Sequence, residues 1–256
     1  MIDETNFICL ATIPKSGTHY MHHFVVNYLR RLIGIEERAL FGSEAHEAYP
    51  NRRYDYINKG KPYEPTGPLP EGVRDIVVQH AFGSLESFPG WIITQARNPL
   101  DFIVSQYHYR HQSRVDTSLH VENISAVVGD YALKWARGYV GFTRLIASDR
   151  KVLPVKYEEL IQQPGDVFRR VVRFIEQPLD DALIDRTIAD IAADKFRQVE
   201  IELTPNPTLT HPLARNGSIG QWRTEMSEAD IEVARRVLKG RRLDLDEIMA
   251  GWEQPA

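Results

Sequence analysis

The chain has 256 residues, of which 43% are hydrophobic and 26% charged, and its formal net charge at pH 7 is −4. This is the composition of an ordinary globular protein that can bury a large core without disulfides or metals, and the mildly negative charge argues against a general nucleic-acid binder. Cys9 is the single cysteine, which excludes an intrachain disulfide and a cysteine-rich metal site. No stretch approaches the length of a membrane span, and the acidic start differs from a signal peptide. We therefore expect a cytoplasmic protein without a membrane partner.

Apolar runs and helical periodicities alternate along the sequence. Strands are predicted for residues 7–13 and for DIVVQHAF (75–82), WIITQARNP (91–99) and KVLPVKYEEL (151–160). Helices are predicted for Thr18 to Ile33, 99–111, 124–148, 164–178, about 180–193, and after the expected N-cap Ser227. Residues 36–73 and 200–222 have an irregular composition. The alternation predicts one α/β domain over residues 1–256, with a mostly parallel central sheet flanked by helices.

The first strand runs into the helix that follows it through the loop Pro-Lys-Ser-Gly-Thr. Such a loop leaves backbone N–H groups at the positive end of the helix dipole, where an anion, most often a phosphate, binds. Gly17 lets the anion approach the backbone, Lys15 adds a charge, and Ser16 and Thr18 add hydroxyl donors. The alternative is a plain strand–helix turn with an exposed lysine. The Walker A pattern is absent, so ATP or GTP hydrolysis is not indicated.

Two further segments carry groups that bind phosphate. In RNPLDFIVS, Arg97 ends a strand and Ser105 follows in the next helix, so a forked guanidinium and a hydroxyl can act together. In RNGSIGQW (215–222), an arginine beside two glycines forms a cationic loop. Each segment alone also fits a surface arginine or an ordinary glycine turn. Spacings typical of zinc ligands are missing, so no metal is expected.

Together these segments resemble the cytosolic-type sulfotransferase family, whose donor is 3′-phosphoadenosine 5′-phosphosulfate (PAPS). The family motifs T-Y-P-K-S-G-T-T-W, R-N-P-x-D-x-x-x-S and R-K-G-x-x-G-x-W correspond to TIPKSGTHY, RNPLDFIVS and RNGSIGQW. A weaker match is VKYEELIQQP, which is similar to V-x-Y-E-D-L-x-x-x-P. The matches occur in family order from residue 12 to 222 and imply the P-loop NTPase-like sulfotransferase fold.

The resemblance implies a donor site. The residues that would hold the 5′-phosphosulfate are Lys15, Ser16, Gly17 and Thr18. Those that would hold the 3′-phosphate are Arg97, Ser105, Arg215 and Gly217, with Asn216 in place of the family's lysine. Positions that contact adenine in the family correspond to Tyr20, which replaces a tryptophan, and to Tyr157 and Phe196.

The resemblance also implies the catalytic groups. The family motif K-T-H-x-P corresponds to VVQHAF, and the resemblance makes His80 the general base. Val78 stands where the family has a lysine. That cation is therefore missing here or comes from elsewhere. Sulfuryl transfer would be in-line through a loose transition state, as in phosphoryl transfer. Lys15 would neutralise the bridging oxygen, and Ser105 would hold Lys15 back until the acceptor arrives.

Other readings stay open at this stage. The acceptor is a small molecule with a hydroxyl or an amine, of unknown class. The family's dimer motif is matched only in part by RTEMSEADIE, with Glu228 in place of a valine, so the oligomeric state is open. Alternative functions are a nucleotide-dependent phosphotransferase and a non-catalytic nucleotide-binding module on the same fold.

Overall fold

The computed structural model describes residues 7–36, 75–80, 82–83, 85, 88, 90–112, 121–191 and 217–253. Most of the two segments of irregular composition therefore lie outside the described residues. The same is true of three predicted donor-site residues, Phe196, Arg215 and Asn216.

The centre of the molecule is a four-stranded sheet with the strand order β2-β1-β3-β4, in which all pairs are parallel. The strands are β1 (Phe7–Thr12), β2 (Asp75–Gln79), β3 (Trp91–Ala96) and β4 (Val152–Lys156). Leu10 pairs with Val78 on one side and Ile93 on the other. Because the strands are parallel, all their carboxyl ends lie at one edge of the sheet, as the sequence predicted.

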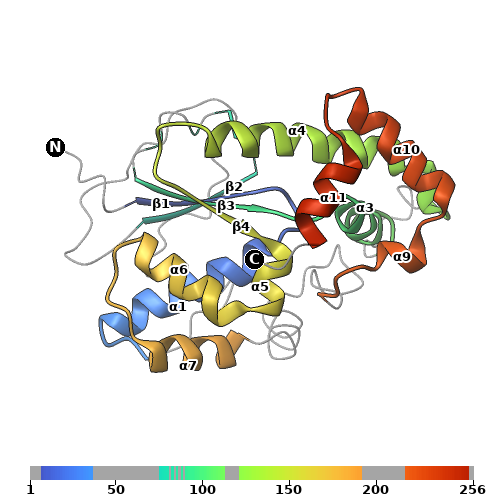
Figure 1. Cartoon of the computed structure of the whole chain (residues 1–256). Helices are drawn as coiled ribbons and strands as arrows, with labels where there is room; N and C mark the ends of the chain where they lie inside the picture. The colour runs from blue at the N-terminus through green and yellow to red at the C-terminus, as the bar shows by residue number, and fades with distance from the viewer. Residues whose placement is uncertain are drawn as a thin grey trace.

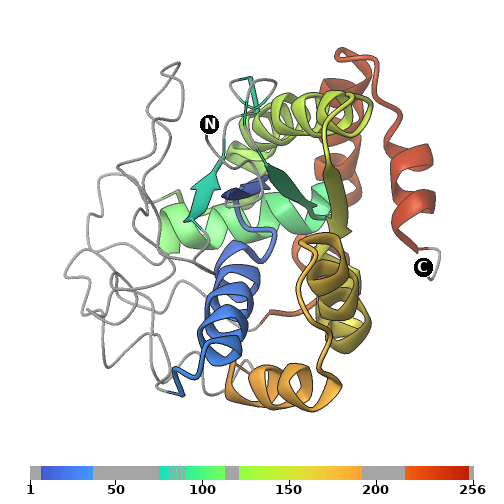
Figure 2. The ribbon, with the colours of Figure 1, turned by 90° about the vertical axis from the view of Figure 1, so that its left-hand side faces the viewer.

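Helices cover both faces of the sheet (Figure 1). On one side lie α1 (Thr18–Leu32), α5 (Tyr157–Gln162), α6 (Pro164–Phe174) and α7 (Asp181–Ile191). On the other side α4 (Val128–Ile146) packs with α3 (Pro99–Tyr107), α10 (Glu228–Lys239) and α11 (Leu245–Glu253). Short helical turns are η2 (His108–Gln112), η4 (Ile124–Ala126) and α9 (Trp222–Glu225). Figure 2 shows the helices above and below the sheet, viewed close to the strand direction.

The alternation of side chains along β1 explains why both of its faces are apolar. Ile8 and Leu10 pack in the cluster that includes α1 and α6, whereas Phe7, Cys9 and Ala11 pack on the opposite face, where α4 contributes Leu145. A parallel sheet covered on both sides requires such continuous apolar strands. Cys9 is fully buried and burial raises the pKa of its thiol, so it is an unreactive core residue.

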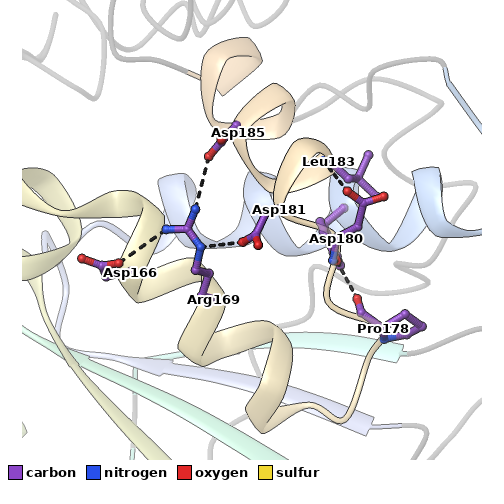
Figure 3. A network of polar contacts seen from close by, with 8 residues as sticks. Asp166, Arg169, Pro178, Asp180, Asp181, Leu183 and Asp185 are labelled. Carbon is purple, nitrogen blue, oxygen red and sulfur yellow. Dashed lines mark hydrogen bonds and ion pairs between the residues drawn. The ribbon is translucent and has the colours of Figure 1, made fainter.

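An exposed ion network joins α6 to α7 (Figure 3). Arg169 on α6 donates to Asp181 at 2.6 Å and also contacts Asp166 and Asp185 at 3.4 and 3.7 Å. The carboxylate of Asp180 accepts the N–H of Leu183 at 2.9 Å, at the start of α7. These contacts link the two helices at the surface, and as exposed pairs they contribute little to stability.

The structure differs from the predictions at the ends of two elements and in two helices that were not predicted. The helix expected over 99–111 is α-helical only to Tyr107 and continues as the π-helix η2. The strand expected over 151–160 ends at Lys156, and α5 begins at Tyr157, where two acidic residues favour a helix start. The short helix α9 and the C-terminal helix α11 were not predicted. The capped helix after Ser227 is confirmed, with a complete capping box.

Candidate active site

The carboxyl edge of the sheet gathers a polar residue from the end of each strand. Thr12 ends β1, His80 follows β2, Arg97 follows β3, and Tyr157 follows β4. The chain leaves β1 toward α1 on one face and leaves β3 toward α3, which packs with α4 on the other. In open α/β sheets, ligands bind outside the strand ends at such a switch point.

The first loop has the backbone geometry of an anion site. Lys15 and Gly17 adopt left-handed conformations, with φ of 66° and 84°. Gly17 is the N-cap of α1 and offers no side-chain oxygen to the first N–H groups of the helix. The hydroxyl of Ser16 is buried and has no hydrogen-bond partner among the described residues. Such unpaired donors at a helix N-terminus are suited to an anion.

Arg97 connects the loops of the first and third motifs. Its guanidinium donates to the carbonyl of Ser218 at 2.8 Å and, at a longer 3.5 Å, to the carbonyl of Lys15. It also lies over the ring of Tyr157, 4.3 Å from the centroid, in a cation–π contact. The buried Nε of Arg97 has no partner among the described residues. We call residues 14–18 together with Arg97 the anion cradle.

Asp101 fixes the third loop and was missed as a functional residue. Its buried carboxylate accepts the backbone N–H of Gly220 at 2.7 Å and of Trp222 at 3.3 Å. The sequence could have indicated a role for Asp101, because it is the aspartate of the R-N-P-x-D pattern. Gln95, which donates to the carbonyl of Ser16 at 3.1 Å, was also missed, and no motif marks it.

Two of the aromatic residues predicted to contact adenine, Tyr157 and Tyr20, lie within the described residues. The hydroxyl of Tyr157 donates to the carbonyl of Gly217 at 3.0 Å, and its ring packs against Gly17. Tyr20 follows on α1, 5.5 Å from the ring of Phe168, and burial raises its pKa to about 12. The Tyr20 phenol is therefore neutral at physiological pH.

His80 is oriented by β1. Its Nδ1 lies 2.9 Å from the carbonyl oxygen of Thr12 and 3.0 Å from the Thr12 hydroxyl, which contacts the hydroxyl of Thr18 at 2.7 Å. A carbonyl can only accept, so Nδ1 carries the hydrogen and Nε2 the lone pair in the neutral ring. This is the tautomer that a general base acting through Nε2 requires.

The surroundings of His80 favour its neutral form. Burial lowers its pKa, the Thr12 carbonyl opposes this shift, and the charges of His19, Lys134 and Lys15 lower the pKa further. Val78 is buried in the core below α1, so that position supplies no cation. Lys134 comes from α4 instead, with its ammonium donating to the Gln106 amide oxygen at 3.0 Å. The charge of Lys134 is one of those that lower the pKa of His80.

Lys15 and Ser105 are both described, and a third residue lies with them. The Lys15 ammonium is over the ring of Tyr109, 4.4 Å from the centroid. Ser105 is half-buried on α3, four positions before Tyr109. The structure thus brings the described predicted residues to one edge of the sheet, on the loops and helices that follow its strands: Lys15, Ser16, Gly17, Thr18, Tyr20, His80, Arg97, Ser105, Tyr157 and Gly217.

Comparison with known proteins identifies the family. The family model described as "Sulfotransferase domain" matches residues 6–253. The chain belongs to the sulfotransferase family. This confirms the family that the motifs predicted and makes the protein a sulfotransferase rather than a phosphotransferase.

Relatives of this sulfotransferase match over most of its length. Cytosolic sulfotransferase 15 of Arabidopsis thaliana is 24% identical, over 89% of this chain and 69% of the relative. Sulfotransferase 1C2 of Homo sapiens is 21% identical, over 91% of this chain and 83% of the relative.

Solved structures confirm the predicted sulfotransferase fold. A retinol dehydratase in complex with retinol and PAP is similar with a TM-score of 0.67 and 15% identity, covering 94% of this chain and 82% of that one. Mouse sulfotransferase SULT7A1 complexed with PAP has a TM-score of 0.63 and 17% identity, covering 93% of this chain and 84% of that one.

Within the described residues of this sulfotransferase, no helix is long and apolar enough to cross a membrane.

Proposed function

We propose that this sulfotransferase moves a sulfuryl group from PAPS to a hydroxyl or amine of a small-molecule acceptor, with His80 as general base. The observation that carries the proposal is the anion cradle, where the buried Ser16 hydroxyl and the Nε of Arg97 are both left without hydrogen-bond partners among the described residues. Unsatisfied buried donors are costly unless a ligand pairs with them. The complexes with PAP, the desulfated product of PAPS, among similar structures support this donor.

The donor would be held at two places. Lys15, Ser16, Gly17 and Thr18 would bind the 5′-phosphosulfate with backbone N–H groups, hydroxyls and one ammonium. The residues proposed for the 3′-phosphate are Arg97, Ser105, Arg215, Asn216 and Gly217. The rings proposed to contact adenine are Tyr20, Tyr157 and Phe196. When bound, PAPS supplies the sulfuryl group and a phosphate leaving group, and no metal is required.

His80 would remove the acceptor proton through Nε2, because Nδ1 is engaged with Thr12. Its lowered pKa keeps the ring neutral at physiological pH, and a positioned base of this kind contributes about 10² to 10⁴-fold. Lys15 would neutralise charge on the bridging oxygen, and Ser105 would restrain Lys15 until the acceptor arrives. In-line transfer then depends mainly on positioning and charge stabilisation.

The acceptor side is proposed in broader terms. Similar structures are complexes with retinol or androsterone, which supports a small organic acceptor. We also propose that residues 1–256 form a single sulfotransferase domain. Relatives named as cytosolic sulfotransferases support a cytoplasmic location.

Calorimetric titration tests the donor assignment without knowledge of the acceptor. We expect adenosine 3′,5′-bisphosphate to bind far more tightly than 5′-AMP or ATP with magnesium. Arg97→Ala should remove the preference, whereas Arg173→Ala, an exposed arginine on α6, should leave it intact. Tighter binding of ATP with magnesium, or no binding at all, would overturn the proposed donor.

A second experiment tests the base. His80→Ala should abolish transfer of labelled sulfate from PAPS to an acceptor panel while the bisphosphate still binds. Unchanged turnover would remove His80 from the mechanism. A wild-type protein that binds the bisphosphate but never transfers sulfate would instead be a non-catalytic nucleotide-binding module.

A further inference from the structure

Tyr109 makes a direct contact with the lysine of the anion cradle. The Lys15 ammonium lies 4.4 Å from the centroid of the Tyr109 ring, well within the distance at which a cation is attracted to an aromatic face. Tyr109 follows Ser105 by four positions, across the junction of α3 and η2. Residues at this spacing lie on the same side of a helix. Ser105 and Tyr109 therefore offer the lysine a hydroxyl and a ring on the same side.

The backbone that carries Tyr109 is fixed from two directions. It belongs to the π-helix His108–Gln112, a rare conformation that often occurs at functional sites. His108 pairs with Glu225 of α9, and the His111 ring nitrogen contacts the Tyr131 hydroxyl of α4 at 2.7 Å. The segment that carries the Tyr109 ring is thus held by the side chains of His108 and His111, which lie before and after Tyr109 in η2.

Lys15 contacts the α3–η2 segment through both its backbone and its side chain. Its carbonyl accepts from the guanidinium of Arg97, which precedes α3, and its ammonium lies on the ring of Tyr109 in η2. The Tyr109 ring therefore holds the end of a side chain whose backbone belongs to the anion cradle.

We propose that Tyr109 is a positioning residue that holds the Lys15 ammonium on its ring and so restrains breakdown of the donor before an acceptor is present. This inference rests on the proposed function, in which Lys15 neutralises the bridging oxygen. A lysine that reached that oxygen too early would promote attack by water. Tyr109 would act through Lys15 and need not touch the donor.

The reaction that Tyr109 would suppress is hydrolysis of PAPS. The water oxygen forms a new bond to sulfur, and the bond from sulfur to the bridging oxygen breaks. The products are inorganic sulfate and adenosine 3′,5′-bisphosphate, and the protons of the water are released to solvent. This reaction needs no acceptor, so it can be measured on the protein as it is.

The test is release of ³⁵S-sulfate from labelled PAPS without acceptor. Tyr109→Leu removes the aromatic face and should raise the hydrolysis rate by about 2- to 30-fold, the factor that corresponds to typical cation–π interactions. Tyr109→Phe keeps the face and should match the wild type. Both variants should bind adenosine 3′,5′-bisphosphate with an affinity within about twofold of wild type, because the rest of the cradle is unchanged. Lys15→Met combined with Tyr109→Leu should abolish the increase.

Two results would overturn the role of Tyr109: hydrolysis by Tyr109→Leu at the wild-type rate, or an equal rise in Tyr109→Phe. If Tyr109→Leu does not fold, Tyr109→Gln provides a second variant without a ring and is judged by the same two criteria. Failure of the proposed function gives a different result, because the wild-type protein would then not bind the bisphosphate. Binding of the bisphosphate with unaltered hydrolysis overturns only the inference about Tyr109.

Discussion

Replacing Gly17 by alanine tests how tightly the anion cradle packs against α5, the helix that follows β4. A Cβ at Gly17 would lie 3.0 Å from Cδ2 of Tyr157 and 3.1 Å from Cδ2 of Leu160. Carbon atoms in favourable contact are about 3.5 to 4.0 Å apart, so one side chain or the loop must move. Gly17 also has a φ of 84°, which is unfavourable for alanine.

Two costs add at this position. The left-handed backbone costs about 1 to 2 kcal/mol for a residue with a Cβ. Crowding of a well-packed site adds typically about 1 to 3 kcal/mol. Gly34 is a matched control, because its φ is 82° and a Cβ there would meet nothing within 4 Å. Gly34→Ala should therefore show the backbone cost alone, and Gly17→Ala should lose about 1 to 3 kcal/mol more.

Urea unfolding followed by circular dichroism measures both losses, and titration with adenosine 3′,5′-bisphosphate measures the effect on the cradle. Gly17→Ala should lose both stability and binding, whereas Gly34→Ala should keep its affinity. Equal losses of unfolding free energy in the two variants would refute the packing argument. Unchanged bisphosphate binding by Gly17→Ala would show that the loop does not hold the donor.

Three further predictions follow from the site and its surroundings. Asp101→Asn puts an amide donor against backbone N–H groups, so it should cost about 1.5 to 3 kcal/mol of unfolding free energy and weaken bisphosphate binding. Asp130→Asn changes an exposed aspartate and should be neutral in both assays. Equal effects of the two substitutions would contradict a role of Asp101 in fixing the third loop. Because the pKa of His80 is lowered, kcat/KM should fall only when the pH drops below the ordinary histidine range near 6.5. Lys134→Gln removes a positive charge that lowers this pKa, so the fall should move to higher pH. A pH profile that does not move in Lys134→Gln would count against His80 as the base. Arg169→Met should lower the thermal midpoint slightly at low salt and not at about 1 M salt, and a loss independent of salt would contradict an exposed ion network.

The central sheet and most of the described site could be predicted from the sequence for a physical reason. Strands buried on both faces appear as continuous apolar runs, and the polar residue that ends each run marks the carboxyl edge of the sheet. Thr12 is the last residue of β1, and His80 and Arg97 each lie one residue beyond the end of a strand. The resemblance then assigned roles that apolar patterning alone does not supply.

The features that the sequence did not predict depend on contacts between distant segments. The π-helix after Tyr107 is held by Glu225 and Tyr131, which lie far along the chain. The short strand β4 could not be separated from α5 because valine, lysine and tyrosine fit either state, and Pro154 is compatible with an edge strand. The effect of the Lys134 charge on His80 follows from the packing of α4 and not from any motif.

The pairing of β1 with β2 has a consequence for the chemistry. Ala11 pairs with Gln79, so the next residues, Thr12 and His80, emerge side by side. Slippage of β2 by a single position would displace the imidazole by about 3.3 Å and turn its neighbours to the opposite face. A one-residue deletion within β2 should therefore silence the enzyme more completely than substitutions around the base. The pairing of β1 with β2 thus sets the position of the proposed base relative to the anion cradle.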